Sequence, residues 1–223
     1  MTAFNHSTRL GTATVLLMLL GSYVFSASAD ASEGDISRIN QGITVDAEQQ
    51  VGDVSSVNGG IRLATGASAG EVTTVNGSIE LDDGVSVSEA HTVNGGIRLG
   101  TDVTVAGELS TVNGGIRVNS GSTVEDNIET VNGRVHVDNA MVGRDIVTTN
   151  GDIEIVRGAV VEGDIRVEGR RRWWDRVFSW SNNRQPSITI DADSTVRGDI
   201  HLYREAKLDI ADGALMGEVI EHF

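Results

Sequence analysis

One ten-residue unit recurs seven times in this sequence, and it constrains the fold more than any other feature. The copies are ISRINQGITV (36–45), VSSVNGGIRL (54–63), VTTVNGSIEL (72–81), AHTVNGGIRL (90–99), LSTVNGGIRV (109–118), IETVNGRVHV (128–137) and IVTTNGDIEI (146–155). Their asparagines stand 18, 18, 18, 19, 19 and 18 residues apart. A repeat this short and regular predicts a stack of similar units rather than a globular core.

Each unit has the period of a β-strand. In Ile61-Arg62-Leu63 the aliphatic residues alternate with a charged one, which places the aliphatics inward and the arginine outward. We therefore predict an all-β fold, a single-stranded parallel β-helix (β-solenoid) with coils of 18 to 19 residues and about three short strands per coil. Coils of 19 residues and β-branched inward positions favour a right-handed helix. The spacing of six between Val57, Leu63 and Ala69 would also suit a left-handed one.

Equivalent residues of stacked coils form columns, because parallel strands lie roughly 4.8 Å apart. Two aliphatic columns are predicted to be buried: Ile43, Ile61, Ile79, Ile97, Ile116, Val135 and Ile153 form one, and Val45, Leu63, Leu81, Leu99, Val118, Val137 and Ile155 form the other. No coil can bury its apolar side chains alone. Stability should therefore arise from contacts between neighbouring coils.

The asparagine of each unit precedes a glycine in most copies. Both residues accept left-handed backbone angles, and stacked asparagines can pass amide hydrogen bonds along a column. We predict a structural ladder, rather than a ligand site, formed by Asn40, Asn58, Asn76, Asn94, Asn113, Asn132 and Asn150.

The first 29 residues have the pattern of a secretory signal peptide. Arg9 precedes an apolar run from residue 14 to 25, and Ala27-Ser28-Ala29 gives a small-residue cleavage site before Asp30. We therefore expect an exported protein, periplasmic or extracellular, with residues 30–223 as one β-helix domain. The chain contains no cysteine, so disulfides and thiolate metal sites are excluded.

The composition also limits the partners. Loss of the signal would remove Arg9 and no acidic residue, which takes 17 basic residues to 16 against 32 acidic ones. This excess of acid argues against nucleic acid as a partner. Residues 36–169 contain no Phe, Tyr or Trp, as expected for a solenoid core that is only a few aliphatic side chains wide.

The repeat is interrupted once, at 170–187, where RRRWWDRVFSWSNNRQPS replaces an expected corner and the repeat then resumes at Ile188. Its spacing predicts a short amphipathic helix. The helix packs on the solenoid wall, or it projects as a contact element towards a membrane interface, an anionic envelope polymer or another subunit. A third interpretation is that the segment is flexible and disordered. The candidate contact residues are Arg170, Arg171, Arg172, Trp173, Trp174, Arg176, Val177, Phe178 and Trp180.

No catalytic or cofactor motif is recognisable. The four histidines after residue 30 lack metal-ligand spacing, and the sequence has no phosphate-binding loop, serine elbow or calcium nonapeptide. We expect no enzyme activity and no cofactor. A threonine column invites comparison with ice-binding solenoids, but it has one threonine per strand where those arrays normally have two. Its members are Ser56, Thr74, Thr92, Thr111, Thr130 and Thr148.

With the repeats aligned, the chain resembles two groups of bacterial proteins. Its Thr-Val-Asn-Gly-x-Ile units resemble the exported β-strand-repeat family of adhesin-like proteins. Its Val-x-Gly-Asp-Ile units, such as 161–165 and 196–200, resemble the bactofilin-like polymer-forming cytoskeletal proteins. The second resemblance implies end-to-end polymerisation without nucleotide. Neither family implies catalytic residues, and a signal peptide departs from the cytoplasmic setting of bactofilins.

Three functions follow in order of preference. Few residues flank the first and last repeats, so the coil ends are expected to lack helical caps, and open strand edges are templates for pairing with another chain. The first expectation is a self-associating envelope scaffold. The alternative is a monomeric binding module that uses 170–187 to contact a membrane surface or an anionic envelope polymer. A polysaccharide-acting β-helix enzyme is third.

Overall fold

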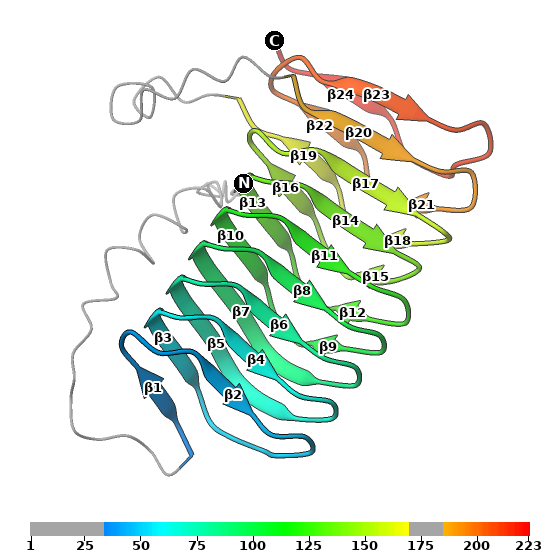
Figure 1. Ribbon diagram of the computed structural model, residues 1–223. Helices are drawn as coiled ribbons and strands as arrows, with labels where there is room; N and C mark the ends of the chain where they lie inside the picture. Colours follow the sequence, from blue (N-terminus) through cyan, green and yellow to red (C-terminus); the bar gives the residue numbers. More distant parts are fainter. Residues whose placement is uncertain (1–33, 170–184) are drawn as a thin grey trace, which may run out of the picture. The chain divides into compact units, whose positions relative to one another are not determined.

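The computed structural model describes residues 34–169 and 185–223, and these form a right-handed parallel β-solenoid (Figure 1). The described residues contain strands and turns but no helix, and therefore no helix long and apolar enough to cross a membrane. Nine strands stack in one of the two sheets, so the solenoid has nine coils. The predicted fold class is confirmed.

Each coil has three faces. Face 1 contains β1(Ile36–Arg38), β3(Val54–Asn58), the second halves of β5(Ser68–Asn76) and β7(Ser86–Asn94), β10(Leu109–Asn113), β13(Ile128–Asn132), β16(Ile146–Thr148), β19(Ile165–Val167), β22(Ile200–Leu202) and β24(Val219–Glu221). Face 2 contains β2(Ile43–Val45), β4(Ile61–Leu63), β6(Ile79–Leu81), β8(Ile97–Leu99), β11(Ile116–Val118), β14(Val135–Asp138), β17(Ile153–Val156), β20(Ser187–Ile190) and β23(Lys207–Ile210). Face 3 contains the first halves of β5 and β7, β9(Thr104–Val105), β12(Thr123–Val124), β15(Met141–Val142), β18(Val160–Val161) and β21(Thr195–Val196).

All strand pairs are parallel and join equivalent residues of successive coils. Face 2 is a sheet of nine strands, whereas faces 1 and 3 form one sheet of fifteen because β5 and β7 run through both. Ile61 pairs with Ile79 and Ile79 with Ile97, as the aligned repeats predict. We call the turn from face 1 to face 2 corner 1, the turn from face 2 to face 3 corner 2, and the turn from face 3 to face 1 corner 3.

The core is a bundle of aliphatic columns. Both predicted face 2 columns are buried, and further columns come from face 1 and face 3, for example Leu109 and Val105. The described core contains no aromatic side chain. The width of the coil explains this composition, because three strands meet around a space that Val, Ile and Leu already fill.

Corner 1 corrects one part of the sequence interpretation. Of the seven ladder asparagines only Asn40 has a left-handed backbone, with φ of 61°. The left-handed residues of the solenoid lie mainly at corner 2, for example Gly66 and Gly84 with φ of 70° and 69°. Glycine follows asparagine at corner 1 for another reason. A Cβ at Gly114 would lie 1.8 Å from the carbonyl oxygen of Gly95 in the preceding coil, closer than any side chain can come.

The first coil supports this explanation. Gln41 occupies the position that glycine holds in the later coils, and no described coil lies beneath it. A side chain is tolerated there because the carbonyl that excludes it elsewhere is missing. Corner 1 is therefore crowded between coils rather than strained within one.

Candidate functional site

The asparagine ladder is present as predicted. Each asparagine after the first donates from its side-chain Nδ2 to the Oδ1 of the asparagine one coil earlier. The N···O distances are 2.7 Å for Asn58 to Asn40, 2.8 Å for Asn76 to Asn58, 2.9 Å for Asn94 to Asn76, 2.9 Å for Asn113 to Asn94, 3.0 Å for Asn132 to Asn113 and 2.9 Å for Asn150 to Asn132. The amides thus bond to one another, which supports a structural role.

An arginine ends the ladder. The next corner 1 would follow β19, but the chain there leads into the predicted insertion, and among the described residues no asparagine follows Asn150 in the column. The Arg204 guanidinium donates instead to Asn150 Oδ1 at 2.7 Å and to the Thr149 carbonyl at 3.1 Å. The sequence does not indicate this contact, because the two residues lie 54 positions apart and no repeat relates them.

The threonine column is buried, so a threonine surface facing water is ruled out. Thr74, Thr92 and Thr111 each donate to a corner 1 carbonyl of the preceding coil, for example Thr111 Oγ1 to Gly95 O at 2.8 Å. These are the carbonyls that crowd out a side chain at the corner. The hydroxyls therefore satisfy buried acceptors and cannot order water outside.

A second ladder, of acidic residues, lies at corner 3. A side-chain oxygen of one coil accepts a hydrogen bond from the backbone N–H of the equivalent residue in the next coil. The donor and acceptor pairs are Asp53 to Asp35, Glu71 to Asp53, Asp145 to Asn127, Asp164 to Asp145, Asp199 to Asp164 and Glu218 to Asp199, at 2.8 to 3.1 Å. The repeated Gly-Asp dipeptides were a signal for this ladder that the sequence interpretation treated only as part of the repeat.

Two carboxyls of the acidic column have shifted pKa values. Burial and the neighbouring charge of Glu129 raise the pKa of Glu108 to about 7. Partial burial acts in the same direction on Asp164, but the N–H of Asp199 and the Arg166 guanidinium outweigh it and hold the pKa of Asp164 below its usual value. The hydrogen bond from the next coil therefore favours the ionised form of Asp164, whereas burial in the middle of the column favours the protonated form of Glu108.

The last coil leaves apolar side chains exposed. Leu208 and Ile210 continue the two buried columns of face 2, and they are only partly buried because no further coil of the described residues stacks on them. Leu215, Val219 and Phe223 are 66%, 39% and 64% exposed. At the other end the outer edges of β1 and β2 have no neighbour among the described strands, and Ile39 is the one large apolar side chain exposed among the described residues of the first coil.

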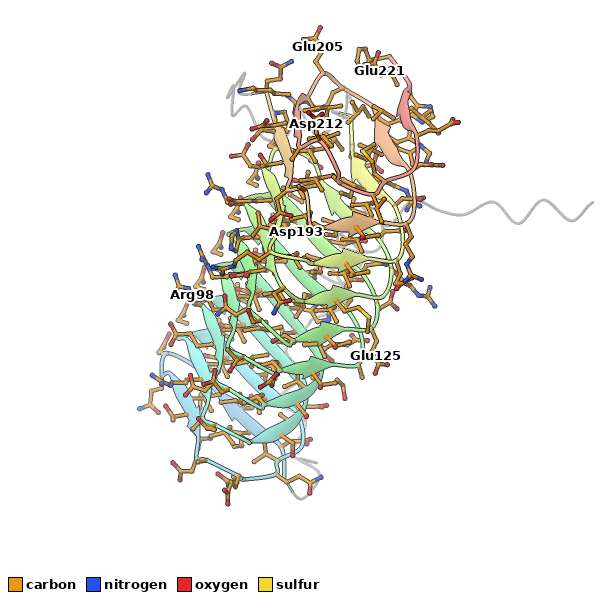
Figure 2. All side chains as sticks on the ribbon, turned by 90° about the vertical axis from the view of Figure 1, so that its right-hand side faces the viewer. Arg98, Glu125, Asp193, Glu205, Asp212 and Glu221 are labelled. Atoms are coloured by element: carbon orange, nitrogen blue, oxygen red, sulfur yellow. The ribbon has the colours of Figure 1, made fainter. Side chains whose placement is uncertain are left out.

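Face 2 carries a hollow with a basic lining, about 230 Å³ in volume, over strands β6, β8, β11 and β14. Its charged lining residues are Glu80, Arg98, Arg117, Arg134 and His136. Figure 2 shows Arg98 projecting from face 2, while Glu125 lies on the opposite edge of the solenoid. The outward arginines were recognised in the repeats, but their grouping around two glycines was not.

Most of the predicted contact segment lies outside the described residues. This applies to Arg170, Arg171, Arg172, Trp173, Trp174, Arg176, Val177, Phe178 and Trp180, and to the signal peptide over 1–29. The strands on either side are described: β19 ends at Val167 and β20 begins at Ser187, and these are consecutive strands of faces 1 and 2. The last residue of the predicted segment is described. Ser187 already belongs to β20, and its backbone N–H and hydroxyl donate to Asp152 Oδ1.

No group of three or more histidine or acidic side chains suited to a metal ion occurs within 34–169 and 185–223. His201 and His222 stack on each other at the last coil, with ring centroids 5.4 Å apart. No family model, no curated protein and no solved structure matches this chain. The resemblance to adhesin-like and bactofilin-like proteins therefore remains a prediction from the repeats.

Proposed function

We propose that the protein is an exported structural β-solenoid that self-associates through its coil ends, and that the last coil is the principal contact. One observation carries the proposal. The aliphatic columns that are buried along the solenoid continue into the last coil as Leu208, Ile210 and Val219, where Leu208 and Ile210 are only partly buried and Val219 is 39% exposed. Covering them with another chain would bury apolar surface that this fold otherwise leaves in water.

Open strand edges add to this tendency. The outer edges of β23 and β24 have no neighbour among the described strands, and such edges readily pair with another strand. In the first coil the outer edges of β1 and β2 likewise have no neighbour in the part of the chain that the structure describes. There, however, Gln41 stands where the carbonyl of a stacked coil would have to lie. An association through the first coil must therefore leave corner 1 unstacked.

The two ends predict different assemblies. If only last coils meet, the contact joins the same surface on two copies and the product is a dimer. If a last coil meets a first coil, the contact repeats and produces a ladder of oligomers or a fibre. A scaffold in the sense of the bactofilin-like proteins requires the second arrangement.

Sedimentation velocity of the purified protein distinguishes these cases. The informative variant is Leu215→Glu with Val219→Lys, which places charges on the last coil. A second variant, Ile39→Lys, places a charge on the first coil and should weaken assembly only where a last coil meets a first coil. We expect the unmodified protein to assemble and the last-coil variant to sediment as a monomer. An unmodified protein that is monomeric over the accessible concentration range would contradict the proposal.

The alternative function is a monomeric binding module. A variant in which 170–187 is replaced by Asn-Gly tests the part assigned to that segment. If this variant no longer assembles while the last-coil variant does, the segment rather than the last coil is the contact. The basic hollow on face 2 also supports a binding function. It is separate from both the 170–187 segment and the last coil.

A further inference from the structure

Face 2 has a basic surface on a protein whose formal net charge is −15. Its outward residues over four coils form two columns, one of Ser78, Gly96, Gly115 and Arg134, the other of Glu80, Arg98, Arg117 and His136. We call this surface the basic trough. It holds three arginines and a histidine against one carboxylate. The excess of positive charge is local and opposite in sign to the rest of the chain.

The arginines of the trough are incompletely paired. Among the described residues Arg117 has no ion-pair or hydrogen-bond partner for its guanidinium. Arg98 lies 3.7 Å from Glu80, and Arg134 lies 3.9 and 3.8 Å from Asp152 and Glu154. A charge-assisted hydrogen bond is shorter, at about 2.7 to 2.9 Å.

Elsewhere on the solenoid arginines do reach that distance. Arg62 meets Asp82 at 2.8 Å, and Arg166 meets Asp145 at 2.7 Å. Outward arginines of this solenoid can therefore form close ion pairs, but the trough arginines do not, and their guanidinium N–H groups remain available as donors. Pairing an exposed arginine within the chain contributes little stability, whereas a ligand carboxylate can accept two parallel bonds from each guanidinium.

Two glycines form the floor of the trough. Gly96 and Gly115 stand in successive coils at the outward position two residues before Arg98 and Arg117. Neither has a side chain, so the backbone lies open between Ser78 on one side and Arg134 on the other. The exposed peptide groups of this floor and the arginines beside it offer hydrogen-bond donors and acceptors to a hydroxyl-rich ligand.

We propose that the basic trough binds a linear polysaccharide that carries carboxylates, with the sugar chain lying along the solenoid axis. Arg98 pairs with Arg117 in register, and Arg117 pairs with His136. Their attachment points are therefore about 4.8 Å apart, in a line. A small anion would use one guanidinium, whereas a polymer with regularly spaced carboxylates can use Arg98, Arg117 and Arg134 together.

The surroundings disfavour a nucleic acid. Asp82 and Asp83 line a second hollow that shares Arg98 with the trough, and Asp152 and Glu154 follow Arg134 and His136 in the next coil. A nucleic-acid strand carries one phosphate per about 3.4 Å and would meet these carboxylates at both borders. A polysaccharide with sparser charge can place its carboxylates on the arginines and its hydroxyls beside the acids.

Binding is tested with a fluorescently labelled oligogalacturonate as the probe, by anisotropy at low and at 150 mM salt, on the full chain. The informative variant is Arg117→Gln, and the matched control is Arg197→Gln, which removes one exposed arginine from another face. We expect Arg117→Gln to weaken binding about tenfold or more and Arg197→Gln to change it less than twofold. Both variants should keep the unfolding midpoint of the unmodified protein.

Four binding results would overturn the proposal. They are no binding at low salt, equal binding of a neutral glucan of the same length, equal losses in both variants, and binding to anionic phospholipid vesicles in place of the oligogalacturonate. A change in sedimentation of Arg117→Gln without any glycan would also overturn it, because the trough would then contact a second copy of the chain. The trough lies away from the last coil. Failure of the glycan-binding proposal therefore leaves the assembly proposal intact, and failure of the assembly proposal leaves the glycan-binding proposal intact.

Discussion

The interior coils and the two terminal coils are built from the same repeat but differ in what their side chains touch. In the interior, Leu99 lies between Leu81 and Val118 of the same column and is fully buried. In the last coil, Ile210 continues that column with a neighbour on one side only. In the first coil, Gln41 stands where interior coils require glycine. The repeat thus specifies an interior that is closed on both sides, and the ends differ from it wherever a neighbour is missing.

This difference shows where interaction energy remains available. An interior coil has its apolar side chains, amides and corner carbonyls satisfied by two neighbours. A terminal coil has them satisfied by one, so its free surface is where another chain gains most. The following substitutions compare interior positions with terminal ones.

The largest difference is expected in the buried column of face 2. Leu99→Ala should lower the free energy of unfolding by about 3 kcal/mol, because the cavity it leaves is enclosed by two coils. Ile210→Ala should cost about 1 kcal/mol, because the site is partly open already. Urea unfolding followed by circular dichroism measures both.

Protein concentration is the control for this pair. If last coils associate, the cost of Ile210→Ala should rise with protein concentration, since association stabilises the folded state by mass action. Equal costs at the two positions in dilute solution would show that the last coil is as closed as the interior.

The second comparison concerns corner 1. Gly114→Ala should destabilise by about 2 to 3 kcal/mol, because a Cβ there would meet the Gly95 carbonyl and force two coils apart. Gln41→Ala should change stability by less than about 0.5 kcal/mol, because nothing described lies beneath it. Thermal unfolding of the two variants decides the point. A small effect at Gly114 would mean that the corner relaxes easily and that the glycine is needed for another reason.

The third comparison uses pH and the middle of the acidic column. The pKa of Glu108 is about 7 in the folded protein, above the ordinary value of 4.5. Between pH 4.5 and 7 the Glu108 carboxyl is therefore protonated in the folded state and ionised in the unfolded state. The stability that the folded protein has with Glu108 protonated is fully present below pH 4.5 and is lost as the pH rises through 7.

We accordingly expect Glu108→Gln to be the more stable protein at pH 8, by about 1 to 3 kcal/mol, and to show little advantage at pH 4.5. Asp164 behaves in the opposite way. Its pKa is lowered, so its contribution is present at neutral pH and is lost as pH falls below the ordinary value of 3.8. Unfolding midpoints at pH 4.5, 6 and 8 test the prediction, with Glu125→Gln on face 3 as the control. A constant difference across this range would contradict it.

The repeat predicted most of the architecture because each feature of it is local. Alternation in Ile97-Arg98-Leu99 gives the inward and outward sides, and the 18-residue spacing gives the partners of Asn76 and Asn94. The contact of Arg204 with Asn150 was not predictable in this way, since it joins residues on either side of the interruption. The backbone angles at corner 1 were predicted wrongly because glycine preference has two causes, and only the stacked carbonyls show which one applies.

The basic trough was in part predictable. Gly-x-Arg occurs in three of the copies, with Arg62, Arg98 and Arg117. The pattern does not show which arginines remain unpaired. Pairing depends on the positions of acidic side chains at corner 2 and in the following coil. Arg62 pairs with Asp82 of the following coil, whereas Asp138, which holds the equivalent position for Arg117, bonds to Arg157 instead.

The smallest expected effects concern the asparagine ladder and its end. Asn94→Ala should cost about 1 kcal/mol, because it removes two amide hydrogen bonds and leaves Asn76 Oδ1 and Asn113 Nδ2 to water. Arg204→Gln should cost less, about 0.5 kcal/mol, because it releases one acceptor, the Asn150 oxygen at the end of the ladder, where the interior asparagine loses two bonds. The order matters more than the size. If Arg204→Gln proves the costlier of the two, then Arg204 does more than end the ladder, and the coils after the interruption depend on it for their attachment to the first seven.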